Sequence, residues 1–323
     1  MAKVPSMTEM PMGSRDDGVI ASGTGGTTSS PMEFPVPADQ LGSVNLSPTG
    51  DFEAGSYQTF VLTYTAGKFG IDDSGSMRVC FRFASDQTRP QFEDPAGPNF
   101  TTIVASNEAV LTYHYDPKGN VRPWDRTLYI KVVRGFLREG DTITITFGDR
   151  SGGSPGMRLQ TFCEESYEFH TLIDPIATFC YQPMPTQPVI RIVPGKPERY
   201  IAIAPTIRAV DETFSIRFKG EDRWGNPSNQ CDATFYPRTN VSVAGLPAKV
   251  RLAKGAFAAE IDGLSVGEPA DLAVEFLDDN GTVVFATNPI RIEENPTSRH
   301  YWGDLHGQSE ETIGTGSATA YFT

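Results

Sequence analysis

The stretch Thr142-Ile-Thr-Ile-Thr-Phe147 decides the fold class, because polar and apolar residues alternate along it with a period of two. Successive side chains of a β-strand point to opposite faces, so this pattern predicts a strand with one face on a core. Its β-branched side chains also favour strands. The same alternation recurs in Met77-Arg-Val-Cys-Phe-Arg-Phe83, where the apolar residues share the core face and Arg78, Cys80 and Arg82 take the other face.

Similar runs follow one another through the first half of the chain. We expect further strands over 58–65, 109–115 and 127–133. Segments rich in Gly, Pro and Asp separate these runs, as turns require. The 31 glycines and 25 prolines of the 323 residues agree with many short strands. This pattern predicts a β-sandwich over residues 41–185, followed by an extended Pro-rich link at 182–188.

The alternation continues over residues 186–295, which we interpret as a second, smaller sandwich. Residues 214–219 alternate, and Asp279-Asn-Gly281 is a strong hairpin signal because Asn-Gly readily adopts positive φ. The turn Asp222-Arg-Trp-Gly-Asn-Pro227 resembles one found in immunoglobulin-like modules that stand beside larger domains in modular proteins. The resemblance implies an immunoglobulin-like fold for this sandwich.

The charge of the chain argues against polyanionic partners. Its 27 basic and 40 acidic residues give a net charge of −13, so its surface repels nucleic acid phosphates and anionic membranes. No run approaches the roughly 18 apolar residues of a membrane helix. Residues 1–40 read as a flexible arm rich in Gly, Ser, Thr and Pro, without the apolar core of a signal peptide. We therefore expect a cytoplasmic protein that binds neither nucleic acid nor membrane.

The four cysteines are Cys80, Cys163, Cys180 and Cys231, and no two of them form a C-x-x-C pair. A structural zinc knuckle is therefore not expected. Reduced thiols are the default for a cytoplasmic protein. A bridge between Cys163 and Cys180 stays open for an exported one.

Residues 296–323 carry the pattern that points to chemistry. Histidine is scarce, with four in the chain, and His306 stands in Tyr301-Trp-Gly-Asp-Leu-His-Gly-Gln308. If this segment is a strand, Asp304, His306 and Gln308 share one face. A carboxylate, an imidazole and an amide on one face suit Zn, Mn or Fe, so we expect a divalent metal site there. The residues after it predict the start of a helix, which would complete a βα unit.

The motif Trp302-Gly-Asp-Leu-His-Gly-Gln308 resembles the opening motif of polymerase and histidinol phosphatase (PHP) type hydrolases, and in particular a bacterial family known as a domain of unknown function. The resemblance implies two β-sandwich domains followed by the first βα unit of a PHP-like barrel. It implies hydrolysis of phosphoesters in a small-molecule substrate by a metal-activated water. Gln308 stands where that family has a second metal-binding histidine. The remaining ligands are expected beyond residue 323 or on a complementary chain, so the isolated chain is expected to be inactive.

The alternative is a non-catalytic β-sandwich module that binds a glycan or a protein partner. Trp124 and Trp224 suit either a sugar-binding platform or packing in a core or between domains. His114 and His170 fall in alternating strands and are interpreted as surface or packing residues. The β-domains also suit a role in oligomer formation.

Overall fold

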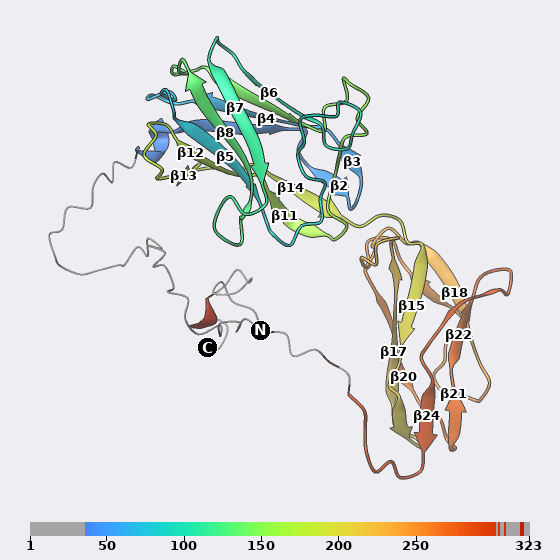
Figure 1. Cartoon of the computed structure of the whole chain (residues 1–323). Coiled ribbons are helices and arrows are strands. Elements are labelled where there is room, and N and C mark those ends of the chain that lie inside the picture. Colours follow the sequence, from blue (N-terminus) through green and yellow to red (C-terminus); the bar gives the residue numbers. More distant parts are fainter. Residues whose placement is uncertain (1–35, 302, 304–306, 308–316, 320–323) are drawn as a thin grey trace, which may run out of the picture. The chain divides into compact units, whose positions relative to one another are not determined.

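The chain is almost entirely β-structure. The computed structural model describes residues 36–301, 303, 307 and 317–319, and within them a short 3-10 helix, η1 (Ala38–Gln40), precedes a long series of strands (Figure 1). The buried apolar side chains form two separate cores, whose strands we call the first and the second sandwich. The prediction of a mainly β chain with little helix is confirmed.

The strands of the first sandwich pair into two large sheets and two small ones. The strands are β1 (Gly42–Ser47), β2 (Asp51–Glu53), β3 (Tyr57–Gln58), β4 (Phe60–Ala66), β5 (Ser76–Phe81), β6 (Thr101–Ala105), β7 (Val110–Asp116), β8 (Arg126–Arg134), β9 (Thr142–Phe147), β10 (Met157–Arg158), β11 (Glu164–Glu168), β12 (His170–Asp174), β13 (Gln182–Pro183) and β14 (Val189–Val193). In hydrogen-bonded order the large sheets are β1-β4-β9-β6 and β13-β12-β5-β8-β7, and the small ones are β11-β14-β2 and β10-β3.

Alternating residues of the large sheets build the first core. In β4 every second residue is buried, and Phe60, Leu62 and Tyr64 are each 0% exposed. Their partners across the antiparallel ladder include Phe147 and Ile145 of β9, which are also 0% exposed. Burial of one such side chain contributes about 1.5–3 kcal/mol. The predicted strand at 142–147 therefore exists because its apolar face completes this core.

The first core extends to both sides of the range predicted for it. Ile190 and Ile192 of β14 are buried in it, and β14 pairs in parallel with β2. Val36 is also buried. Its backbone N–H donates to Oε1 of the Gln182 side chain at 2.8 Å, and Nε2 of Gln182 donates to the Val36 carbonyl at 2.9 Å. The last residues of the segment predicted as an arm therefore pack on this core. Residues 1–35 lie outside the described residues.

The second sandwich has three small sheets, in the orders β15-β17-β20, β16-β24-β21 and β19-β18-β22-β23, among the described residues. Its strands are β15 (Arg199–Ile203), β16 (Ile207–Ala209), β17 (Phe214–Glu221), β18 (Ala233–Thr239), β19 (Val250–Leu252), β20 (Ala259–Leu264), β21 (Ala270–Leu272), β22 (Val274–Leu277), β23 (Val283–Ala286) and β24 (Ile290–Glu293). The predicted hairpin is formed by β22 and β23, and Gly281 between them has φ 77°. Phe276 and Phe285 stack at 4.5 Å across this hairpin.

The PHP-like βα unit predicted after the second sandwich is not shown by the structure. Tyr301, Gly303 and Gly307 have no strand pairing, while Ala318 and Thr319 have helical backbone. The other residues of the predicted strand and helix start lie outside the described residues.

Candidate functional site

The outer face of the five-stranded sheet gathers polar and aromatic side chains. In β5 the apolar residues Met77 and Val79 point to the core, so Arg78 points away from it. Arg78 pairs in register with Tyr129 of β8, and Tyr129 pairs with His114 of β7. These three side chains therefore form one row across the sheet. The sequence placed Arg78 on this face and left His114 as a surface or packing residue, whereas Tyr129 was not recognised.

Arg78 is held by neutral groups. Its guanidinium Cζ lies 3.7 Å from the ring centroid of Tyr181 and 5.8 Å from that of Tyr129. Its Nη1 donates to Oδ1 of Asn120 at 3.3 Å. Its Nε is buried and has no acceptor, and no carboxylate lies within ion-pair distance of Arg78 among the described residues. The Arg78 guanidinium is therefore oriented by its neighbours, but it has no ion-pair partner among the described residues.

Tyr181 is fixed over the arginine by a second contact. Its hydroxyl and the Ser76 hydroxyl lie 2.7 Å apart in a hydrogen bond. Burial raises the pKa of Tyr181 to about 12, so the phenol stays neutral at physiological pH. The ring therefore presents a cation–π partner to Arg78, a contact worth about 0.5–2 kcal/mol.

These side chains enclose a pocket of about 220 Å³. It is lined by Arg78, His114, Asp116, Gly119, Thr127, Tyr129, Phe179 and Tyr181. Asp116 accepts a hydrogen bond from the Lys118 amide at 2.8 Å through Oδ1, and within the described part of the chain it has no ion-pair partner. A Cβ on Gly119 would lie 2.9 Å from Cβ of Thr127, so the turn after β7 can pass this close only with glycine. The pocket thus holds a positive and a negative group that do not neutralise each other.

A second aromatic pair stands on the same face. The Trp124 ring stacks on the His170 ring at 4.7 Å with an interplanar angle of 17°, and His170 Nδ1 lies 2.6 Å from Oε1 of Glu168. Through the register, His170 pairs with Cys80, and Cys80 pairs with Thr127 of the pocket. His170 therefore lies on β12, the strand next to the β5 strand of Arg78, opposite a residue two positions along from Arg78.

Cys80 lies between these two features and is 0% exposed, although its strand position faces away from the core. The Thr127 hydroxyl and the Asn120 amide each lie 3.5 Å from its Sγ and cover it. Burial raises the pKa of the Cys80 thiol to about 11, so the thiol is protonated and inert. Its role is to fill the sheet surface beneath Asn120, which orients Arg78.

Two larger hollows have their arginines already paired. One, of about 470 Å³, is lined by Arg238 and Glu275, which form an ion pair at 2.7 Å. The other, of about 490 Å³, includes Arg191, which pairs with Asp51 at 2.9 Å and with Glu165 at 3.0 Å. The smaller pocket at Arg78 is therefore the better candidate for a site that binds a polar ligand.

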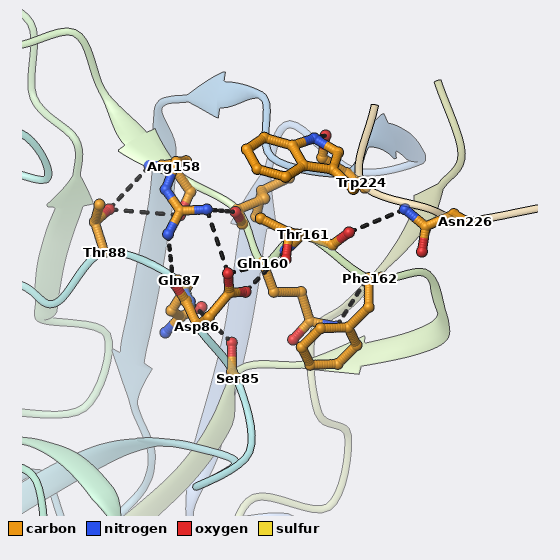
Figure 2. A network of polar contacts seen from close by, with 12 residues as sticks. Ser85, Asp86, Gln87, Thr88, Arg158, Gln160, Thr161, Phe162, Trp224 and Asn226 are labelled. Atoms are coloured by element: carbon orange, nitrogen blue, oxygen red, sulfur yellow. Dashed lines mark hydrogen bonds and ion pairs between the residues drawn. The ribbon is translucent and has the colours of Figure 1, made fainter. Parts of the chain in front are cut away.

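The loop after β17 is held by a network of hydrogen bonds within the protein. Figure 2 shows Trp224 and Asn226 beside Thr161, which is in turn bonded to Asp86. The Trp224 indole donates to the Ala54 carbonyl at 3.0 Å, and the Asn226 amide donates to the Thr161 carbonyl at 2.9 Å. These groups are satisfied by the protein itself. The sequence allowed Trp224 to serve either in a sugar-binding platform or in packing, and these contacts support packing.

The predicted metal ligands Asp304, His306 and Gln308 lie outside the described residues, so their assignment stays a prediction. In the part of the chain that is described, no three His, Cys, Asp or Glu side chains gather in a way that could hold a metal ion. Within the same part, no helix is long and apolar enough to span a membrane.

Comparison with known proteins finds no matching family model and no matching curated protein. Among solved structures, the D0-D1 domain of intimin is similar at 11% identity, with 77% of this chain and 97% of that chain covered and a TM-score of 0.23. The D00-D0 domain of intimin is similar at 10% identity, with 78% of this chain and 100% of that chain covered and a TM-score of 0.29. The adhesin InvE of Yersinia pseudotuberculosis is similar at 9% identity with a TM-score of 0.24. The match covers 79% of this chain and 59% of that chain.

These findings correct two predictions made from the sequence. The chain was expected to belong to a family related to PHP-type hydrolases and to be the N-terminal part of a metal-dependent hydrolase. No family model supports that relationship, and the similar structures are adhesin domains with immunoglobulin-like sandwiches. The prediction rested on one short motif near residue 306.

Proposed function

We propose that this chain is a non-catalytic β-sandwich module that binds a glycan on the outer face of the β13-β12-β5-β8-β7 sheet. The observation that carries the proposal is the pocket in which the rings of Tyr129 and Tyr181 stand beside the unmatched charges of Arg78 and Asp116. A sugar ring has apolar C–H faces and a rim of hydroxyls. Aromatic rings suit the faces, and a small number of placed polar groups suits the rim.

The same face supports a glycan better than a protein partner. A stable protein interface buries about 800 Å² on each side around an apolar centre. The centre of this face is instead a small pocket with charged groups in it. The Trp124–His170 stack gives a chain of sugars a second aromatic contact on the same face.

The test is retention on saccharides. The whole chain is applied to a glycan array and to insoluble cellulose, chitin and xylan. We expect binding to at least one of them, and we expect Tyr129→Ala and Trp124→Ala each to weaken it by about two- to twelvefold, since one ring contact is worth about 0.5–1.5 kcal/mol. Tyr236→Ala, on the second sandwich, is the matched control and should leave binding unchanged. Failure to retain any saccharide, or equal binding by all three variants, would refute the proposal.

A further inference from the structure

We infer that the pocket at Arg78 takes a single uncharged sugar ring, with Arg78 donating to one hydroxyl and Asp116 accepting from another. This inference rests on the proposed function, because it names the chemical class that the same face selects. The inference goes beyond the proposed function because it assigns the choice of sugar to two particular charged residues, Arg78 and Asp116.

The free hydrogen-bonding positions of the two residues are complementary. Arg78 uses Nη1 for Asn120, and its Nε is buried without an acceptor, so Nη2 is the nitrogen left to donate to a ligand, since it has no acceptor among the described residues. Asp116 uses Oδ1 for the Lys118 amide, so Oδ2 is the acceptor without a donor in the same part of the chain. A hydroxyl both donates and accepts, so a ring with two hydroxyls satisfies both groups at once.

The mixed charge of the pocket selects against charged sugars. A carboxylate or sulfate near Arg78 would also stand near Asp116, in a chain whose net charge is −13. An amino sugar near Asp116 would in turn stand near Arg78. Like charges close together in one pocket disfavour binding, so both kinds of charged ligand meet a repulsive partner. An uncharged polyol meets none.

The size of the pocket suits one sugar ring. Its volume of about 220 Å³ is below the roughly 300–1,000 Å³ typical of sites for drug-sized molecules. Two tyrosine rings and Phe179 line it, and Phe179 is 79% exposed at the rim. A ring that enters can therefore contact aromatic side chains while its neighbours in a longer glycan remain on the open face.

The experiment measures binding of small sugars to the whole chain by saturation-transfer NMR and titration. The probes are the methyl glycosides of glucose, galactose, mannose and xylose, with glucuronate, galacturonate and glucosamine as charged counterparts. We expect at least one methyl glycoside to bind, with a Kd that changes less than twofold between 50 and 500 mM NaCl, since charge screening does not act on a neutral ligand. Arg78→Gln and Asp116→Asn should each raise this Kd about tenfold or more.

Arg238→Gln is the matched control, because Arg238 lies on the other sandwich and is already paired with Glu275. The Kd of this variant for the sugar should equal that of the parent chain. Thermal unfolding of each variant shows whether it is folded. Binding of uronates alone, with a Kd that rises steeply with salt, would overturn this inference and leave the proposed function standing. Neutral binding that is unchanged in both Arg78→Gln and Asp116→Asn would also overturn it. Absence of binding to every saccharide would overturn both.

Discussion

The guanidinium of Arg78, on strand β5, lies over the ring of Tyr181, which stands directly before strand β13, at 3.7 Å from Cζ to the ring centroid. A cation is thereby held at the surface of a sheet without a carboxylate partner among the described residues. A buried donor without an acceptor, such as Nε of Arg78, lowers the stability of the folded protein. Proteins often keep such a cost where a side chain serves to bind a ligand.

Arg78→Met should therefore abolish sugar binding without unfolding the protein. The substitution removes a buried Nε that has no acceptor and keeps much of the side-chain volume. We expect the free energy of unfolding to stay within about 1 kcal/mol of the parent value, or to rise. Urea denaturation and the binding titration measure the two effects side by side. Arg238→Met serves as the comparison and should keep full binding. A loss of several kcal/mol in Arg78→Met would mean that the arginine is structural.

Alkaline pH should destabilise the first sandwich through Tyr181. The phenol ionises at 10.0 when exposed, and burial raises its pKa to about 12 in the folded protein. Between these values the unfolded chain loses the proton before the folded one, so the free energy of unfolding falls as the pH rises from 10 towards 12. Urea denaturation at pH 7, 9, 10 and 11 measures the slope. Tyr181→Phe should show a smaller slope, at a cost near neutral pH of about 1 kcal/mol for the lost bond to Ser76. An unchanged slope would contradict the assignment to Tyr181.

Asp222 should be a main support of the second sandwich. Asp222 is 2% exposed, and its carboxylate accepts hydrogen bonds from the backbone amides of Gly195 and Trp224 and from both the backbone amide and the side chain of Asn226. Asp222→Ala leaves these donors without an acceptor. We expect a loss of about 3 kcal/mol at pH 7, measured by chemical denaturation. Asp262→Ala, at an exposed position bonded only to the next amide, should cost less than about 0.5 kcal/mol.

The contribution of Asp222 should also vanish in acid. Burial alone raises its pKa, but the hydrogen bonds from Asn226, Gly195 and Trp224 outweigh burial and hold the pKa below its usual 3.8. The stabilisation is therefore present above that value and is lost as the pH falls through the lower pKa of the folded state. The difference between parent and Asp222→Ala should shrink as the pH falls below 3.8. A difference that is the same at pH 7 and pH 2 would be inconsistent with a charged carboxylate.

The thiols should react in a fixed order. All four cysteines are free, with Cys163 and Cys180 exposed and Cys80 and Cys231 buried. Burial, with the nearby Asp222 and Glu165 carboxylates, raises the pKa of Cys163 to about 11, so it holds little reactive thiolate at pH 8. Iodoacetamide should label Cys180 first and Cys163 slowly, while the other two react only in urea. Mass spectrometry of tryptic peptides follows each site. A native bridge between Cys163 and Cys180, which the sequence left open, would block labelling of both.

Local sequence predicted much of the β-structure because alternation is a property of a single strand. Residues 142–147 and the hairpin around Gly281 were recognised in this way, and Arg78 was placed on the outer face. The burial of Cys80 was not predictable, because the groups that cover it come from Asn120 and Thr127. Tyr129 could have been found, since the alternation of 127–133 places it opposite the apolar residues.

The candidate site was not predictable as a unit. The sequence drew attention to Asp304, His306 and Gln308, because a short motif with histidine stands out when the chain is read locally. The outer sheet face has no such motif. Its members come from β5, β7, β8 and the segment before β13, and each is an ordinary residue of an alternating run.

The sequence by itself determined that the chain would form many short strands and that its tight turns would fall at Gly, Pro and Asn. Only the tertiary structure decided which strands lie side by side, including the parallel pairing of β14 with β2 and the placing of Tyr181 over Arg78. The reason is physical. Alternation sets the face to which a side chain points, but backbone hydrogen bonds are nearly the same at every residue, so the choice of partner strand depends on how the buried faces pack together.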